Sequence, residues 1–161
     1  VRIPRSKTRN MKWLKPYSSL FYVANQEDFV VFDERTKGSV ALIKNGGKQL
    51  VNCNCSISMP LLLLSAFENG DVSMVDFRMM EEVGKRLNTG LPITQFDVHQ
   101  HLPFAVGIAG QQLTAFSYEG EELESTIQDM NYTPDSFCLH LTEASCAVRS
   151  GKNIQCVIID Y

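Results

Sequence analysis

The sequence predicts an all-β protein in which one small antiparallel sheet is built four times. Three observations lead to this prediction. A hairpin pattern recurs along the 161 residues, the interval between its copies is nearly constant, and a further short strand pattern precedes each copy. Hydrophobic periodicity of this kind is the main signal of secondary structure in a sequence.

The clearest hairpin lies in "FENGDVSMVDFR", residues 67–78. An apolar run, "PLLLLSAF", leads into the pair Asn69-Gly70, and a second run at 72–75 follows it. Asn-Gly between two apolar runs predicts a tight hairpin, because both residues tolerate a positive φ. The second strand of the hairpin ends at Asp76.

The same layout returns three times when the chain is aligned on Asp76. An upstream copy, "SSLFYVANQEDFVVFDER", ends at Asp33, and "LPFAVGIAGQQLTAFSYEG" carries Ser117 at this position. The last copy, "ASCAVRSGKNIQCVIIDY", is aligned on Asp160. The intervals of 43, 41 and 43 residues match the period of about 40–45 residues that is typical of four-stranded propeller blades.

Further strand patterns complete each unit. A short alternating strand is expected before each hairpin, at residues 10–14, 51–57, 93–98 and 137–141. A more polar strand is expected after the first three hairpins, at residues 39–44, 83–88 and 121–127. The middle strands are apolar on both faces, as stacked blades require. We therefore expect a WD-repeat-like β-propeller fragment of about four blades of four-stranded antiparallel sheet, with the last blade incomplete, over residues 10–44, 50–88, 93–127 and 137–161.

One segment allows a helix as an alternative. "FRMMEEVGKRLN", residues 77–88, can be drawn as an amphipathic turn or two. Gly84 interrupts that pattern, and the same position in the other units is a loop followed by an outer strand. We therefore favour a strand there.

The two ends of the array lack neighbours. The chain starts at Val1 rather than Met, and a closed ring of seven such blades needs roughly 300 residues by the same period. The first blade has no neighbour on one side, and the last lacks its outer strand. We expect the chain to be a piece of a longer protein or to pair with another copy, so that the rest of the propeller or that copy closes the ring.

Charge is distributed unevenly. Residues 1–49 carry ten Lys or Arg and four Asp or Glu, whereas residues 50–161 carry five and fourteen. Residues 1–9 form a basic N-terminal arm, whose common interpretation is a solvated segment; contact with an acidic protein, phosphate or nucleic acid is the alternative. The run "YEGEELESTIQDMNYTPD" has six acids and no base, which predicts a solvated outer edge or a contact with a basic partner, such as the arm of a second copy.

No residue set predicts catalysis, a cofactor or a bound metal. The sequence contains no dinucleotide-binding, P-loop, nucleophile-elbow or zinc-protease motif. Cys53 and Cys55 have no second pair of ligands for zinc, so we interpret them as buried strand residues. His99 and His101 lie at a strand end and its turn, which favours turn capping or solvent exposure.

Five cysteines at scattered spacings argue against a disulfide framework and favour a reducing compartment. No run approaches the roughly 20 apolar residues that a membrane helix needs.

Residues that recur at the blade period are interpreted as structural. Asp33, Asp76 and Asp160 fall at the same place in their units, which favours strand-end hydrogen bonding over three catalytic carboxylates. The predicted blade-turn residues are Asp33, Asn69, Gly70, Asp76, Gly110, Gly151 and Asp160.

The period and layout resemble the WD-repeat family, with "FD", "VD" and "ID" in place of the dipeptide "WD" and no "GH" pair. Over residues 60–161 the resemblance is closer. "NGDVSMVDFRM" and "GLPITQFDVHQHLPFAVGIAGQQLTAFSYEGEEL" look like the last blades of the propeller of Raptor proteins, the scaffold subunits of TOR kinase complex one. Residues 1–50 match only in layout, and residues 135–161 match in pattern more than in identity.

This resemblance implies a non-catalytic scaffold, with subunits of the TOR kinase complex as partners. It also implies a cytoplasmic protein that is recruited to the lysosomal surface. No binding residue of that family can be placed on a position of this sequence. The alternatives are a generic WD-repeat adaptor in another complex, an enzyme built on a propeller, and a nucleic-acid or phospholipid binder that uses the basic arm; without interleaved aromatic residues in the arm, we expect no nucleic acid.

Overall fold

The computed structural model describes residues 10–14, 19–24, 28–36, 38–44, 47–77, 79, 81–119 and 122–161. Within these ranges the chain forms fifteen strands and no helix. None of the described segments is a helix long and apolar enough to cross a membrane. The predicted basic arm at 1–9 lies outside the described residues.

The strands form four antiparallel sheets, which confirms the predicted fold class. Blade 1 holds β1 (Asn10–Trp13), β2 (Leu20–Ala24), β3 (Asp28–Asp33) and β4 (Gly38–Lys44). Blade 2 holds β5 (Leu50–Asn54), β6 (Leu62–Phe67), β7 (Asp71–Asp76) and β8 (Glu81–Asn88). Blade 3 holds β9 (Ile93–Val98), β10 (Phe104–Ala109), β11 (Gln112–Glu119) and β12 (Glu122–Gln128). Blade 4 holds β13 (Ser136–Leu139), β14 (Ser145–Ser150) and β15 (Asn153–Ile158).

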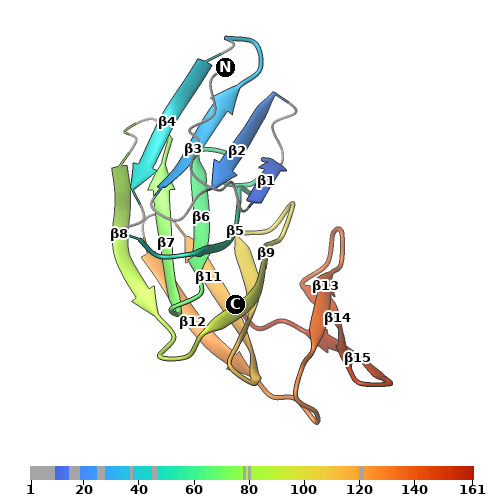
Figure 1. Ribbon diagram of the computed structural model, residues 1–161. Coiled ribbons are helices and arrows are strands. Elements are labelled where there is room, and N and C mark those ends of the chain that lie inside the picture. The colour runs from blue at the N-terminus through green and yellow to red at the C-terminus, as the bar shows by residue number, and fades with distance from the viewer. Residues whose placement is uncertain are drawn as a thin grey trace.

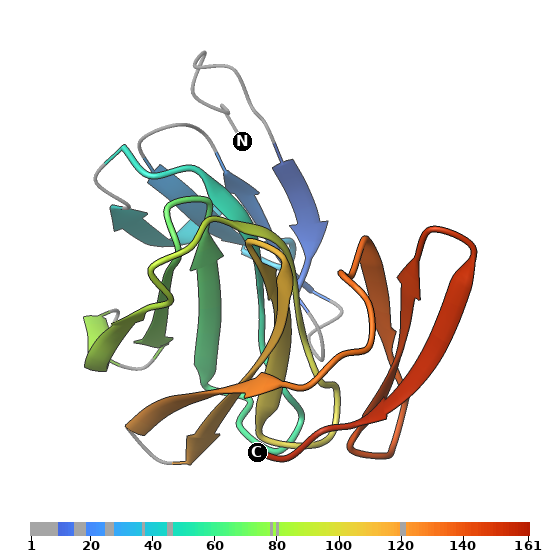
Figure 2. The same cartoon turned by 90° about the horizontal axis from the view of Figure 1, so that it is seen from below.

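The blades follow one another in a fan (Figure 1 and Figure 2). Inner strand β5 contacts inner strand β9 of the next blade, and outer strand β8 contacts outer strand β12. Residues 81–88 form a strand, so the helical alternative for this segment is wrong. Its residues pair with β7 across a register shift, which keeps Val83 and Leu87 in contact with the core and leaves Gly84 exposed.

Strand register corrects one sequence alignment. Asp33, Asp76 and Ser117 pair with the first residues of the preceding strands, Leu20, Leu62 and Phe104. In blade 4, the first residue of β14 pairs with Ile158, so Asp160 lies two residues beyond the equivalent position. The alignment on Asp160 was wrong because it matched this acid to Asp33 and Asp76 by residue type. The pairing of β14 with β15 is instead determined by the turn at residues 150–153, and it puts Ile158 at the equivalent position.

Blades 1, 2 and 3 bury apolar side chains on both faces of the sheet, and blade 4 buries them on the face turned to blade 3. We call the face turned to the following blade its front face and the opposite face its back face. Three clusters of buried residues join consecutive blades. Between blades 1 and 2 the cluster includes Tyr22, Val31, Cys53 and Leu63, between blades 2 and 3 Leu64, Met74, Phe96 and Phe116, and between blades 3 and 4 Phe104, Val106, Phe137 and Cys146.

The hairpin turn of blade 2 requires glycine. Gly70 has φ +90° and donates its N–H to the carbonyl of Phe67 at 3.0 Å. Its own carbonyl accepts the N–H of Thr89 at 3.0 Å. A Cβ at this position would lie 2.5 Å from the carbonyl oxygen of Leu91. The turn is therefore held against the loop that leads into blade 3, with no room for a side chain.

We predict that Gly70→Ala lowers the free energy of unfolding by about 3 kcal/mol, since it combines an unfavourable φ with a backbone clash. The matched control is Gly90→Ala, with φ +72° and no atom within 4 Å of the added Cβ; it should cost only about 1 kcal/mol. Chemical denaturation measures both. Equal losses in the two variants would contradict the close approach at Gly70.

Candidate functional site

Amide side chains on the inner strands connect neighbouring blades. Asn52 on β5 donates its Nδ2–H to the backbone carbonyl of Phe96 on β9 at 2.8 Å. Its Oδ1 accepts hydrogen bonds from the hydroxyl of Tyr22 at 3.2 Å and from Lys12 Nζ at 3.3 Å. Because both Asn52 and Tyr22 are buried, these bonds satisfy polar groups that would otherwise be costly to bury.

The same bridge recurs one blade later. Gln95 on β9 lies 43 residues after Asn52, and its Nε2 donates to the carbonyl of Phe137 on β13 at 3.0 Å. Its Oε1 accepts the N–H of that residue at 3.3 Å. The Gln95 side chain therefore bonds both backbone groups of Phe137, as a neighbouring strand would do. The two amides fix consecutive blades at the same height along their inner strands.

A second row of links follows at the ends of the inner strands. Ser56 donates its hydroxyl to the carbonyl of Gln100 in blade 3 at 3.2 Å. His99 lies 43 residues further on, and its Nε2 is 3.1 Å from the carbonyl of Glu143 in blade 4. The Nδ1 of His99 accepts the N–H groups of His101 at 3.1 Å and Leu102 at 3.0 Å. Since Nδ1 is an acceptor, Nε2 carries the proton and donates to blade 4.

Burial sets the protonation state of His99. The side chain is fully buried, and its ring stacks on Phe104 with a centroid separation of 4.6 Å. Burial lowers the pKa of His99, against the opposing effect of the hydrogen bond with the Glu143 carbonyl. The neighbouring His101 and His140 lower this pKa further through their charge. The neutral His99 ring, with its proton on Nε2, is therefore the stable form, and this form makes the hydrogen bond to blade 4.

A carboxylate cluster lies at the other end of blade 2. Asp71, 6% exposed, forms an ion pair with Lys48 and accepts hydrogen bonds from Asn69 and Asn88. Arg86 lies 3.7 Å from the same carboxylate. Burial by itself raises the pKa of Asp71, but the hydrogen bonds from Lys48, Asn88 and Asn69 outweigh it and bring the pKa to about 2. The cluster ties β7 and its turn to β8 and to the loop before β5.

The predicted blade-turn residues lie apart, in four blades. The carboxylate of Asp33 accepts the N–H of Arg35 at 2.9 Å and its guanidinium at 2.7 Å. Asn69 bonds to Asp71, and Asp76 is buried at the end of β7. Asp160 is exposed, and its backbone carbonyl accepts a hydrogen bond from Gln128 at 3.2 Å.

Two glycines from that prediction occupy hairpin turns. Gly110 has φ +62° and donates its N–H to the carbonyl of Pro92 at 2.7 Å. Gly151 has φ +58° and donates to the carboxylate of Asp135. None of the predicted blade-turn residues lines a shared cavity, and their structural role stays a prediction.

Cysteine and histidine residues form no metal centre in the described part of the chain, which holds no group of three or more His, Cys, Asp or Glu suited to a metal. Cys53 and Cys55 are buried, as predicted. Burial raises the pKa of both thiols, so they are protonated packing residues without nucleophilic character. His99 does cap its turn, but it is buried and joins two blades, which sequence reasoning missed.

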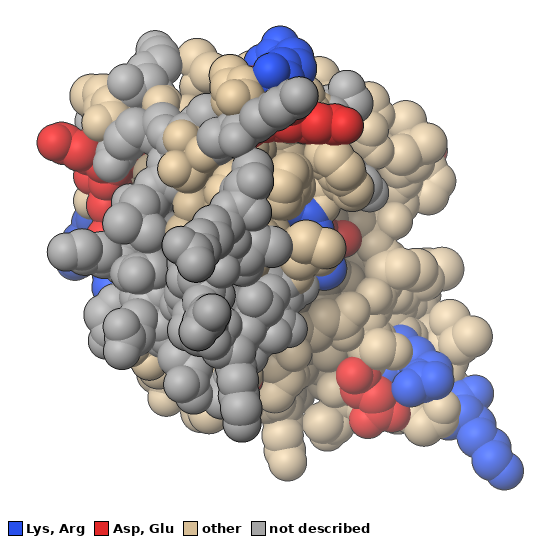
Figure 3. All heavy atoms as spheres, turned by 45° about the horizontal axis from the view of Figure 1, so that its top comes forward, with Lys and Arg blue, Asp and Glu red and all other residues tan. Residues whose placement is uncertain are grey.

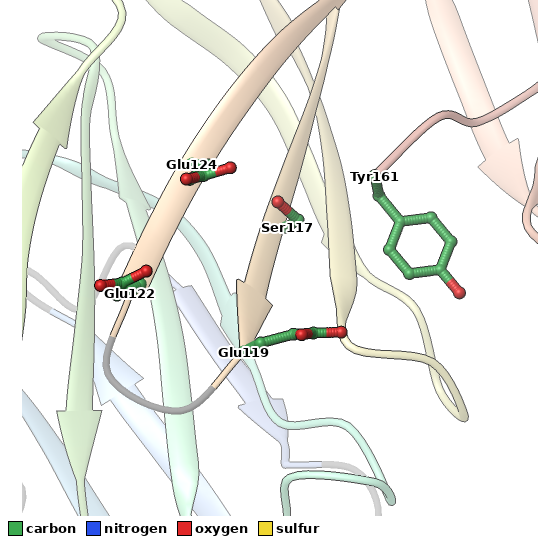
Figure 4. A pocket seen from close by; sticks show the side chains of 5 residues that line it. All are labelled: Ser117, Glu119, Glu122, Glu124 and Tyr161. Atoms are coloured by element: carbon green, nitrogen blue, oxygen red, sulfur yellow. The ribbon is translucent and has the colours of Figure 1, made fainter.

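Surface cavities lie at several places on the described blades. One of about 490 Å³ lies between the first residues of β5 and β9, lined by Gln49, Leu50, Val51, Glu68, Pro92, Ile93 and Thr94. One of about 270 Å³ lies on the front face of blade 3 and is lined by Ser117, Glu119, Glu122, Glu124 and Tyr161 (Figure 4). One of about 240 Å³ lies on the first blade, lined by Met11, Lys12, Trp13 and Phe21.

In Figure 3 the charged side chains of the visible described residues form small separate groups of both signs. The 270 Å³ cavity gathers three glutamates beside an aromatic ring, without a base or nucleophile activated by a neighbour.

Comparisons with known proteins place this fold. No protein-family model matches the sequence, and no curated protein matches it significantly. Solved structures match in 566 chains, so the fold is widespread. The β-propeller domain of Cps50 (Swd1) from Myceliophteria thermophila superposes with a TM-score of 0.77 at 10% identity, over 91% of this chain and 50% of that one.

Two further structures agree. Raptor from Chaetomium thermophilum has a TM-score of 0.75 at 19% identity, over 94% of this chain and 15% of that one. The WD40 domain of SCAP from fission yeast has a TM-score of 0.75 at 9% identity, over 97% and 40%. The chain therefore has the fold of WD40 β-propellers over four consecutive blades, and it spans half or less of the length of these proteins. Because other WD40 structures match as well as Raptor does, the fold does not identify this chain with any particular WD40 protein.

Acid should weaken the protein through Asp71. Its pKa is lower in the folded state than the unfolded value of about 3.9, so its contribution is complete above pH 4 and is lost as the pH falls towards 2. We predict a loss of about 2 kcal/mol over this interval, and a flatter profile for Asp71→Asn. Denaturation at several pH values measures it. The control Asp129→Asn, an exposed acid, should keep the original slope.

His99 should produce a separate pH dependence at higher pH. Its folded pKa lies below the unfolded value of about 6.5, so its stabilising effect is present above this value and falls as the pH drops below it. We predict that the free energy of unfolding of the native chain decreases as the pH falls from 7 to 5, and that it decreases less in His99→Gln. Chemical denaturation at several pH values measures this difference. Lys152→Gln, at an exposed position in the last hairpin turn, is the control. A native slope in His99→Gln would contradict the assignment.

Proposed function

We propose that this chain is part of a non-catalytic scaffold that binds other proteins. The observation that carries the proposal is the rigid connection of consecutive blades. The buried side chains of Asn52 and His99 and the half-buried side chain of Gln95 fix blade 2 to blade 3 and blade 3 to blade 4 through hydrogen bonds to backbone atoms. Such a frame holds exposed turns and cavities in fixed positions, which is what a docking platform needs.

The surface chemistry supports the same function. The cavities at the edges of the blades are lined by mixed polar and apolar side chains, and the described residues offer no metal cluster. The cavity between β5 and β9 is the largest of the three described above and lies at the ends of two rigid inner strands. We propose it as a contact surface for a partner.

At a finer level, we propose a scaffold of TOR kinase complex one, which acts in the cytoplasm and at the lysosomal surface. Support comes from the sequence stretches at 69–79 and 90–123, which resemble the Raptor propeller, and from the 19% identity with Raptor from Chaetomium thermophilum. A generic WD-repeat adaptor in another complex is the coarser version of the same proposal.

The test is purification of the full protein that contains this chain, after mild cross-linking in its native cells, with quantitative mass spectrometry. We predict stoichiometric protein partners, including subunits of the TOR kinase complex. Other stoichiometric partners alone would refute the TOR version and retain the adaptor. The absence of any stoichiometric partner would refute the scaffold.

A surface variant sharpens that experiment. Glu68→Lys combined with Thr94→Lys changes the charge of the 490 Å³ cavity and should lower the recovery of one partner about tenfold. The control is Glu81→Lys, an exposed acid on outer strand β8. Equal losses in both variants, or none in either, would contradict a contact at the cavity.

A further inference from the structure

The outer strand of blade 3 ends its sheet with a long, regular edge. In the order β12-β11-β10-β9, no strand pairs with β12 on its other side among the described residues. β12 spans seven residues, and its pairing with β11 keeps one register throughout. Because β11 occupies only one edge of β12, the backbone N–H and C=O groups of the other edge are available to a further strand.

The exposure of this edge does not depend on where the chain begins or ends. Blade 3 has a neighbour on each side, and those neighbours pack on the faces of its sheet rather than on its outer edge. By strand register, Glu124 occupies the position that Glu81 occupies in blade 2. Glu81 is exposed although blade 3 follows blade 2. A fourth strand in blade 4 would therefore leave Glu124 and the edge of β12 accessible.

The outer strands of blades 1 and 2 are less suited to accept a further strand. The pairing of β4 with β3 and that of β8 with β7 each contain a register shift. β8 also carries Gly84, with φ +68°, and the cations Lys85 and Arg86. Irregular pairing and basic side chains are common means by which proteins prevent strand addition at an edge. β12, "ELESTIQ", has no register shift and contains no Lys, Arg, Pro or Gly.

The side chains of β12 indicate which kind of strand fits this edge. Glu122 and Glu124 lie on the front face, close to Glu119 at the end of β11 (Figure 4). Residues 119–135 include six acids and no Lys or Arg. On the back face, Ile127 is 58% exposed. Since opposite charges on adjacent strands stabilise a sheet and like charges destabilise it, the edge fits a strand with Lys or Arg on one face and apolar residues on the other.

A cavity at the end of β12 extends the same surface. Its volume is about 340 Å³, and it lies between the last residues of β12, the loop that follows them and the turn between β10 and β11. Its lining includes Gln111, Gln112, Ile127, Asn131 and Tyr132. A strand that runs antiparallel to β12 has its first residues at this cavity. Side-chain amides both donate and accept hydrogen bonds, so those of the cavity can hold the backbone that precedes the added strand.

We propose that the outer edge of β12 binds an extended basic segment of a partner protein, which adds to blade 3 as a fifth, antiparallel strand. Lys or Arg side chains of that segment face Glu122 and Glu124, and its backbone bonds the free edge of β12. The proposal rests on the protein-binding function proposed above, but it needs neither the 490 Å³ cavity nor the TOR kinase complex. Its failure would therefore leave the scaffold and its partners untouched.

The first test measures peptide binding to the full protein that contains this chain, by fluorescence anisotropy. The probe is a labelled peptide of about ten residues in which Lys and Val alternate, so that all Lys side chains lie on one face of the extended strand. We predict a dissociation constant below about 100 μM at low ionic strength. A peptide with Glu in place of Lys should bind at least about tenfold more weakly. A dissociation constant above this limit, or equal binding of the two peptides, overturns the proposal.

Backbone methylation separates strand addition from simple charge attraction. In an extended peptide, the N–H groups of the Lys residues point to one edge and those of the Val residues to the other. Methylating one set should weaken binding at least about tenfold, whereas methylating the other should have a much smaller effect. Amide hydrogen exchange at residues 122–128 should slow when the unmodified peptide binds. Equal affinities of the two methylated peptides, or unchanged exchange in β12, overturns the proposal.

Substitutions then locate the site on β12. Glu122→Lys combined with Glu124→Lys should weaken binding of the Lys-Val peptide about tenfold or more. The control is Glu34→Lys combined with Glu81→Lys, which makes the same change of charge at exposed acids of blades 1 and 2 and should leave the affinity unchanged. Thermal unfolding verifies that both variants fold, and the methylation test stands if the first does not. Equal affinities of the two double variants contradict the assignment to β12.

Discussion

The structure depends on one constraint: a sheet of three or four strands that is apolar on both faces cannot bury both of them alone. Each blade of this chain carries such a pair of faces, and each internal face is covered by the neighbouring blade. The hydrophobic effect favours this stacking without fixing its geometry. The nearly constant repeat length contributes to this geometry, because equivalent strands of consecutive blades begin and end at equivalent positions.

Directional contacts then convert a stack into a frame. Asn52 and Gln95 hold the inner strands of consecutive blades, and Ser56 and His99 hold the turns that follow those strands. Each link runs from a side chain of one blade to a backbone group of the next, so a substitution in one blade affects the position of its neighbour. The bond of Asn52 to Phe96 is buried, so losing it leaves an unsatisfied group, which costs more than the bond contributes when formed; the other three links are partly buried.

The frame of linked blades relates directly to the proposed function. Rigid blades allow loops to diverge and to bind different proteins without a change of fold, which is why many unrelated proteins share this architecture.

The sequence by itself determined the class of fold and nearly every strand, because period-2 apolar alternation and a turn signal repeated every 41–43 residues are local properties that survive in the chain. It also predicted that the thiols of Cys53 and Cys55 are buried. Only the tertiary structure decided that Ile158 rather than Asp160 stands in the repeated position, since ladder register depends on how a turn closes. The roles of Asn52, Gln95 and His99 were likewise decided there: their spacing of about one blade was visible, but an amide or imidazole acquires a partner only when another blade brings a carbonyl within 3 Å or so.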